Sequence, residues 1–272
     1  MDRFFSSYPH SASFALISAL WLAIAWGCDS QPPKCACAYD EPAEPVEFER
    51  APKHGTMNID ILPKLPADAV WVNGSSRISA TPSTPEELGA AAHVFHNWLH
   101  KYPLPLVAAE VERIYFVHDI RIGDRPTACT YFKENLVVAI DHPEHIESAL
   151  HTAFAGLLLR RHAECLDFQA WGAACEPTDA AIRLRSEFEH AVTAQPPDNP
   201  VRLYEAGYLD PSTIAHPEND FCRVFMSIFI YNERLQDLGS KYPRIERKTE
   251  LCADFMRCLD PSFNWPIAAK AK

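Results

Sequence analysis

Glu144, Glu147 and His151 are the densest group of side chains in this sequence whose types could bind a metal ion. They follow one another at intervals of three and four residues, which would place them on one flank of a helix. Two carboxylates and an imidazole could hold a divalent cation such as zinc. Acidic residues at the start of a helix also complement its dipole without any metal. The pattern therefore predicts either a metal site or an ordinary helix N-terminus.

A second group of histidines lies earlier in the chain. His93, His96 and His100 occur three and four residues apart, within one broad face of a helix predicted from Pro85 to Tyr102. Such a face could bind a metal ion. Helical histidines without a carboxylate partner are more often polar surface residues, so both interpretations stay open.

Composition excludes several classes of protein. The sequence contains neither H-E-x-x-H nor G-x-S-x-G, the motifs of zinc peptidases and of many serine hydrolases. Glycine is scarce, with 9 residues, and no glycine-rich phosphate loop occurs. The net charge is −11 and no basic stripe is present, which argues against nucleic acid as a partner. An acidic surface also disfavours adsorption to anionic lipid, so membrane attachment is expected only through the N-terminus.

The N-terminus resembles a bacterial export signal. Residues 12–27 read ASFALISALWLAIAWG without a charge, which is short for a membrane-spanning helix and suits a signal-peptide core. The letters AWGC, ending at Cys28, resemble the lipobox of bacterial lipoproteins, in which the cysteine is lipidated and becomes the mature N-terminus. We predict a signal peptide at 1–27 and a lipoprotein anchored at Cys28 to a membrane of the cell envelope. The alternatives are an ordinary cleaved signal, giving a periplasmic or secreted protein, and an uncleaved anchor.

The rest of the chain divides into a linker and one domain. Residues 28–56 are rich in proline, glutamate and alanine and show no periodicity, which predicts an extended tether. Residues 57–266 carry the periodic segments of a single domain. The whole chain is 47% hydrophobic, which is ample for a packed core.

The cysteine count fits an oxidising compartment. Nine cysteines are present, and lipidation of Cys28 would leave an even number. At least one disulfide is predicted among the six cysteines of the domain, which are Cys129, Cys165, Cys175, Cys222, Cys252 and Cys258. Cys252 and Cys258 lie on different faces of one predicted helix and are not expected to pair with each other. The alternative is a set of buried free thiols.

The order of predicted elements indicates an α+β fold. Strands are predicted at 57–62, 69–72 and 113–119, and a hairpin at 127–141 with its turn at 133–135. Helices are predicted at 85–102, 143–161, 168–174, 180–190, 217–231, 233–241 and 244–259. A small N-terminal sheet with a hairpin, followed by a mostly helical C-terminal half, is typical of an α+β domain.

Six segments between Thr84 and Phe263 resemble, in order and spacing, a family of bacterial zinc-dependent metallopeptidase-like proteins. Many members are lipoproteins, and the family is related to the zincin fold. The segments are HNWLHKYP, VERIYFVHDIRIGDRP, TYFKENLVVAID, SALHTAFAGLLLRRH, AGYLDPSTIAHPENDF and KYPRIERKTELCADFMRCLDPSF. The resemblance implies a zincin-like fold for this domain.

The residues that would perform zinc chemistry differ from the family pattern. In the family, the middle helix usually carries H-H-E-x-x-H. His151 falls on the first histidine, which is not a ligand. Thr152 and Gly156 fall on the two zinc histidines, and Ala153 falls on the general-base glutamate.

The later stretch differs as well. In the family it usually reads like G-F-V-S-x-Y-A followed by E-D-F-A-E. Ser212 falls near the tyrosine, Asp220 matches, and Arg223 falls on the final glutamate. An arginine there would repel a cation.

These differences predict a degenerate site. Zinc hydrolysis needs three protein ligands and a carboxylate that deprotonates the bound water, and the substituted residues supply neither. We therefore expect a non-catalytic binding protein, or pseudopeptidase, with no cofactor and an unknown protein or peptide partner in the former cleft beside His151. The alternative is an active metal-dependent hydrolase whose rearranged zinc site uses Glu144, Glu147 and His151, with His142 or Asp220 as a further ligand.

Overall fold

The computed structural model describes residues 59–66, 72–73, 76–176, 180–181, 183–184, 200–214 and 216–263. The predicted signal peptide at 1–27, the lipidation site Cys28 and the predicted tether at 28–56 lie outside these residues. No helix within the described ranges is long and apolar enough to cross a membrane.

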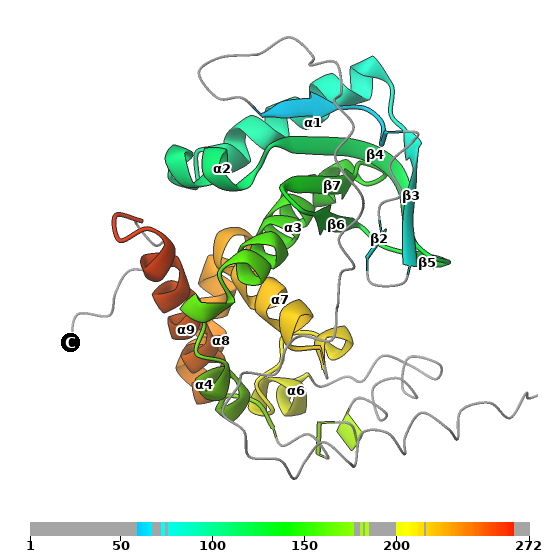
Figure 1. Cartoon of the computed structure of the whole chain (residues 1–272). Helices are drawn as coiled ribbons and strands as arrows, with labels where there is room; N and C mark the ends of the chain where they lie inside the picture. Colours follow the sequence, from blue (N-terminus) through cyan, green and yellow to red (C-terminus); the bar gives the residue numbers. More distant parts are fainter. Residues whose placement is uncertain are drawn as a thin grey trace, which may run out of the picture. The chain divides into compact units, whose positions relative to one another are not determined.

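A mixed sheet forms the first half of the domain (Figure 1). Its strands follow the order β2 (Val72–Asn73), β3 (Ser76–Pro82), β4 (Arg113–Ile122), β7 (Asn135–Ala139) and β6 (Cys129–Phe132). β4 and β7 are parallel, whereas β6 runs antiparallel to β7 as the first arm of a hairpin. Two short strands, β1 (Asp60–Leu62) and β5 (Arg125–Pro126), also pair with β4. β6 therefore lies at one end of the main strand order.

Two helices, α1 (Pro85–Leu99) and α2 (Leu104–Glu110), separate β3 from β4 in the chain. α1 begins at Pro85 as the sequence predicts, and Thr84 caps it. Its Oγ1 accepts a hydrogen bond from the backbone N–H of Glu87, and the Glu87 carboxylate accepts one from the N–H of Thr84. α1 ends at Leu99, three residues before the predicted end at Tyr102. The chain then turns, and α2 begins after its N-cap residue, Pro103.

The central helix α3 (Ile146–Arg161) follows a short 3-10 turn, η1 (Pro143–His145). It lies between the strands and the C-terminal helices, in contact with α1, α7, β6 and β7 (Figure 1). Almost every side chain from Ala149 to Leu159 is buried, with only Thr152 partly accessible. α3 is therefore an internal helix, buried on nearly all of its faces.

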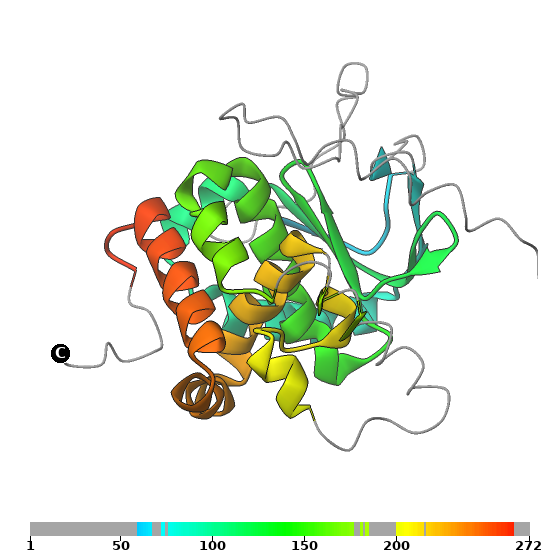
Figure 2. The same ribbon diagram turned by 90° about the horizontal axis from the view of Figure 1, so that it is seen from below.

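The C-terminal half is helical, and its helices pack against one another and against α3 (Figure 2). Its elements are η2 (Ala163–Cys165), α4 (Phe168–Ala173), α6 (Val201–Glu205), η3 (Pro211–Thr213), α7 (Pro217–Ile230), α8 (Asn232–Lys241) and α9 (Pro243–Leu259). This arrangement confirms the α+β fold predicted from the sequence. Most of the helix predicted at 180–190 lies outside the described residues.

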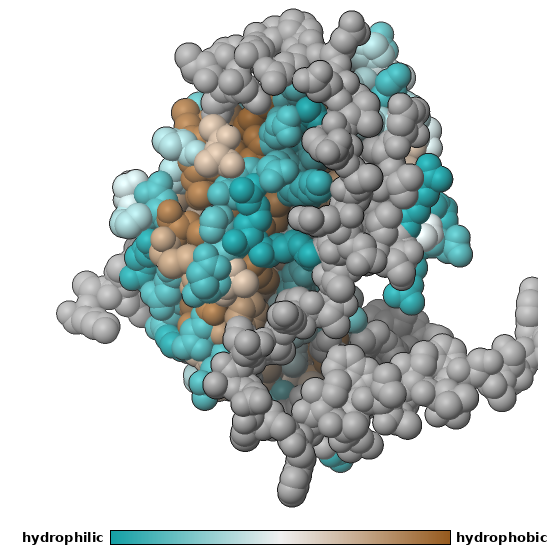
Figure 3. Space-filling model, viewed as in Figure 1, coloured by the Kyte–Doolittle hydropathy of each residue, from teal (hydrophilic) through white to brown (hydrophobic). Residues whose placement is uncertain are grey.

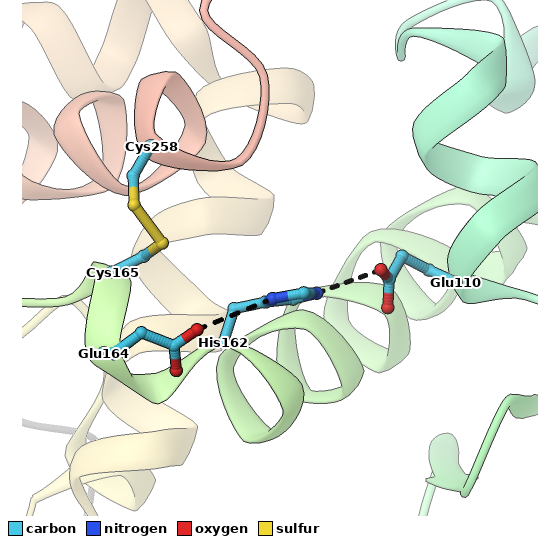
Figure 4. Close-up of a disulfide and its surroundings, with 5 residues drawn as sticks. All are labelled: Glu110, His162, Glu164, Cys165 and Cys258. Atoms are coloured by element: carbon cyan, nitrogen blue, oxygen red, sulfur yellow. Dashed lines mark hydrogen bonds and ion pairs between the residues drawn. A yellow bond between two sulfur atoms is a disulfide. The ribbon is translucent and has the colours of Figure 1, made fainter.

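A disulfide joins Cys165, at the end of η2, to Cys258, near the end of α9, with their Cα atoms 5.7 Å apart. Figure 4 shows this bond beside His162, which lies between Glu164 and the buried Glu110 of α2. The prediction of a disulfide within the domain is confirmed, as is the expectation that Cys252 and Cys258 do not pair with each other.

Hydrophobic side chains are mostly packed inside. On the face drawn in Figure 3, hydrophobic residues are interspersed with hydrophilic ones. Among the described residues, the large hydrophobic side chains that stand exposed are Leu104 and Tyr231. Tyr231 lies at the junction of α7 and α8, beside the cavity described below.

Candidate functional site

The three positions that were predicted to correspond to zinc ligands and a general base, Thr152, Ala153 and Gly156, all lie on α3. Thr152 is partly buried, and its hydroxyl donates to the backbone oxygen of Ser148 in the preceding turn at 2.8 Å. Ala153 is buried and offers no polar atom. Gly156 is buried as well and carries no side chain. None of these positions presents a free donor atom toward a ligand.

The side chain of Tyr131, from strand β6, covers Gly156. A Cβ atom built at Gly156 would lie 2.5 Å from Cε1 of Tyr131 and 3.1 Å from its Cδ1. The phenolic hydroxyl of Tyr131 donates a hydrogen bond of 2.7 Å to Oε1 of Glu218, at the start of α7. Ring, glycine and carboxylate thus pack together where β6, α3 and α7 meet.

Zinc does not fit this arrangement. The carboxylate that lies nearest to Gly156 is that of Glu218, and Tyr131 already donates to it. A catalytic zinc ion needs three protein ligands around an open position, but here an aromatic ring fills the space above α3. Within the described ranges, no group of three or more histidine, cysteine, aspartate or glutamate side chains is arranged to hold a metal ion.

His151 is fully buried rather than lining an open cleft, so the expectation that it forms the cleft wall is wrong. Its Nδ1 lies 2.5 Å from the hydroxyl of Tyr102, and its ring stacks on Phe229 with centroids 4.5 Å apart. Burial lowers the pKa of His151 well below its usual value, and the charge of Lys101 lowers it further. His151 is therefore a neutral imidazole at physiological pH.

The alternative metal group is only partly assembled. Oε1 of Glu147 lies 4.0 Å from Nε2 of His151, but the ammonium group of Lys101 contacts the same carboxylate oxygen at 2.6 Å. A divalent cation would have to displace this ammonium charge. Glu144 lies instead beside the exposed imidazoles of His142 and His145, at 3.6 and 3.9 Å.

Asp220 belongs to an internal ion pair. Its Oδ2 lies 2.6 Å from Nζ of Lys248 and accepts a 3.0 Å hydrogen bond from Nε1 of Trp171. Lys248 also donates to the backbone oxygen of Gly207 at 2.6 Å and lies 4.5 Å from the ring centre of Tyr208. Burial raises the pKa of the Asp220 carboxyl, and the Lys248 charge opposes that rise. Asp220 thus binds together α7, α9 and α4 and does not face an open site.

Ser212 and Arg223 both contact Asp210. Oδ1 of Asp210 accepts hydrogen bonds from the backbone N–H and hydroxyl of Ser212, at 2.8 and 2.6 Å. Nη2 of Arg223 lies 3.3 Å from Oδ2 of the same carboxylate. Asp210 therefore stabilises the turn η3 and orients the Arg223 guanidinium.

Arg223 lines a cavity of about 170 Å³ between α6, α7 and α8. The wall also carries Tyr204, Ser227, Tyr231 and Arg234, together with three leucines. Nη2 of Arg234 donates to the hydroxyl of Tyr204 at 3.0 Å. Two guanidinium groups and hydroxyl groups beside an apolar wall suit a ligand that combines an anionic group with an apolar body.

Sequence reasoning missed Tyr131, Glu218 and Arg234. Glu218 lies two residues before Asp220, but no local pattern marks it as a neighbour of Gly156. The proximity of Tyr131 and Glu218 depends on tertiary packing across 87 residues. No protein-family model, no curated protein and no solved structure matches this chain.

Proposed function

We propose that this protein is a non-catalytic binding protein built on a metallopeptidase-like, zincin-like scaffold. One observation carries the proposal: the Tyr131 ring occupies the space into which a ligand side chain at Gly156 would project. The hydrogen bond from Tyr131 to Glu218 holds the nearby carboxylate in the same cluster. Because Thr152 and Ala153 supply no metal-binding atom, zinc chemistry has no ligand set at these positions.

The cavity beside Arg223 and Arg234 is the place where such a protein would hold its partner. Glu218 and Arg223 are five residues apart on α7, which rotates them by roughly 140° about the helix axis. The cavity therefore lies on a different side of α7 from the Tyr131 cluster. Its arginines and leucines fit the carboxylate and apolar side chain at the C-terminal end of a peptide.

Export and anchoring belong to the same proposal. The apolar segment at 12–27 and Cys28 support a lipoprotein held at a membrane of the cell envelope, with 28–56 as its tether. In that arrangement the domain binds a protein or peptide partner at a membrane surface. Mass spectrometry of protein from its native host tests this directly. A diacylglyceryl-modified Cys28 at the mature N-terminus is expected, and an unmodified N-terminus elsewhere would remove the anchor.

A peptidase assay tests the absence of catalysis. The purified full chain is incubated with an unstructured protein substrate, with added zinc or with EDTA, and no chelator-sensitive cleavage is expected. The alternative function, hydrolysis through Glu144, Glu147 and His151, requires cleavage that EDTA abolishes. Loss of that cleavage in Glu147→Gln would establish the alternative and overturn this proposal.

Binding is tested with two probes of equal size. N-acetyl-leucine carries a free carboxylate, whereas N-acetyl-leucinamide does not. Saturation-transfer NMR should detect contact of the carboxylate probe with the protein, and the signal should weaken in Arg223→Gln and in Arg234→Gln. Arg247→Gln is the matched control, because Arg247 is an exposed arginine of α9 paired with Glu250. Equal signals from both probes, or from all variants, would contradict recognition of a carboxylate.

A further inference from the structure

His96 and His100 lie one turn apart on α1 with both imidazoles exposed. Their Nε2 atoms form a hydrogen bond of 3.0 Å, in which one ring donates to the other, and their ring planes are nearly perpendicular, at 88°. His100 is the C-terminal cap of α1, so both rings project from the last turn of a stable helix. Neither ring belongs to the Tyr131 cluster or to the Arg223 cavity.

The separation of the two nitrogens suits a shared metal ion. An imidazole nitrogen binds a transition metal at about 2.0–2.1 Å, so two nitrogens at right angles around one ion lie about 2.9 Å apart. Tetrahedral ligands at the same bond length lie about 3.3 Å apart. The observed 3.0 Å is therefore nearer to the right-angled geometry, which Cu²⁺ and Ni²⁺ favour, than to the tetrahedral geometry of zinc.

We propose that His96 and His100 bind one divalent transition-metal ion through their two Nε2 atoms, with Cu²⁺ bound more tightly than Ni²⁺ or Zn²⁺. The ion replaces the hydrogen bond between the two Nε2 atoms, so both rings then carry their proton on Nδ1, and water completes the coordination. The order of affinity follows from the right-angled geometry and from the general preference of nitrogen ligands for copper. This inference goes beyond the proposed function and does not depend on it.

The surroundings of the pair favour a cation. The chain has a net charge of −11, which raises the concentration of cations near its surface. The positive charge that follows His100 in the chain, Lys101, is held by Glu147 at 2.6 Å. His93 is also exposed but lies seven residues, or two helical turns, before His100. It is therefore too far away to bind the same ion as His96 and His100.

Titration of the full chain with CuCl₂, purified without a histidine tag, tests the site. Isothermal titration should show one Cu²⁺ bound per chain at this site, and electron paramagnetic resonance should show nitrogen ligands in a tetragonal field. His96→Ala and His100→Ala should each lower the affinity on the order of 100-fold, because the second ligand of a chelate acts at a high effective concentration. His93→Ala is the matched control and should retain the wild-type affinity.

Alanine at these exposed helix positions favours the helix, so the variants should fold normally. The double variant His96→Ala/His100→Ala should lose the residual binding that either single variant keeps at this site, since neither imidazole then remains. Thermal unfolding adds a second readout, because Cu²⁺ should raise the melting temperature of the wild type and of His93→Ala only. Unchanged copper affinity in either single variant, or tighter binding of Zn²⁺ than of Cu²⁺, would overturn the proposal.

Discussion

Tyr131 and Glu218 are 87 residues apart in the chain, yet the hydroxyl of one donates to the carboxylate of the other at 2.7 Å. This contact links the terminal strand of the main sheet order, β6, to the first turn of α7. Because the ring of Tyr131 also covers Gly156, one side chain closes the region in which the proposed metallopeptidase-like scaffold would hold a metal.

Building a zinc motif into α3 should therefore require removal of Tyr131. The triple variant Thr152→His/Ala153→Glu/Gly156→His should gain no stoichiometric zinc, since the ring would clash with the new histidine. Adding Tyr131→Ala to that variant should free both the space and the Glu218 carboxylate, which completes a ligand set of two histidines and one glutamate. Elemental analysis after dialysis measures the difference. Zinc bound equally by both variants would show that Tyr131 does not close the site.

Gly156→Ala alone should destabilise the protein. The added methyl group would lie 2.5 Å from the Tyr131 ring, and overpacking of this kind costs about 1–3 kcal/mol. Gly89→Ala in α1 is the matched control, because nothing lies within 4 Å of its new Cβ atom. The free energy of unfolding of that variant should rise by about 0.5–1 kcal/mol, because alanine favours a helix more than glycine does. Urea denaturation measures both, and a stabilised Gly156→Ala would contradict the close packing described here.

Lys248→Met should be among the most damaging substitutions in the domain. It leaves the buried carboxylate of Asp220 without its cation, a change that costs about 3–5 kcal/mol. Lys241→Met removes one partner of an exposed pair with Asp237 and should cost less than about 1 kcal/mol. Adding Asp220→Asn to Lys248→Met should recover part of the loss, since no buried charge then remains. Chemical denaturation of the three variants at pH 7 gives the comparison.

The stability of Lys248→Met should depend on pH. Burial already raises the pKa of Asp220, and removal of Lys248 removes the charge that opposes this rise. A carboxyl whose pKa is raised by folding favours the folded state below its unfolded pKa, and this contribution is lost as the pH rises through the folded value. Lys248→Met should therefore be less destabilised at pH 5 than at pH 7. An equal loss at both values would contradict this assignment.

His118 should titrate above its ordinary value. Its hydrogen bond to Glu87 raises its pKa most, and Asp141 raises it further against the effect of burial. The pKa of Glu87 is lowered to about 2, most strongly by the hydrogen bond from the backbone N–H of Thr84 and next by the hydrogen bond from His118. The stabilisation from His118 is thus complete below its unfolded pKa and is lost as the pH rises through the raised value. The stabilisation from Glu87 is present above the unfolded pKa of that carboxyl and is lost as the pH falls toward 2.

NMR titration of the imidazole signals measures this directly. Glu87→Gln should lower the pKa of His118, because it removes the charge that His118 contacts at 3.1 Å. His93→Gln changes an exposed histidine on the same helix and is the matched control. An unchanged His118 pKa in Glu87→Gln would show that this contact does not form in solution.

Local patterns predicted much of the fold. Helix α1 begins at Pro85 as predicted, and the turn near Lys133 joins two strands as expected, because helix starts and turns depend on neighbouring residues. No helix was predicted at 104–110, because Pro103 follows the predicted end of the first helix and was interpreted only as its end. Proline is also favoured at the start of a helix, and Pro103 is the N-cap of α2.

The candidate site was harder to predict than the elements that form it. His151 was expected beside an open cleft, but α3 is buried on nearly all of its faces and His151 is enclosed. Its neighbours Tyr102 and Phe229 come from distant segments, and together they enclose the imidazole. The contact of Tyr131 with Gly156 likewise depends on the packing of a strand against a helix, which helical periodicity does not encode.

The bond between Cys165 and Cys258 closes a covalent ring that contains α4, α6, α7, α8 and most of α9. A protease that cuts the backbone once anywhere inside this ring linearises it but releases no fragment. The two pieces stay covalently joined until the bond is reduced, and a second cut inside the ring would release only the segment between the two cuts. If the protein is exported as proposed, a single nick in an oxidising compartment would leave the C-terminal helices attached to the rest of the domain.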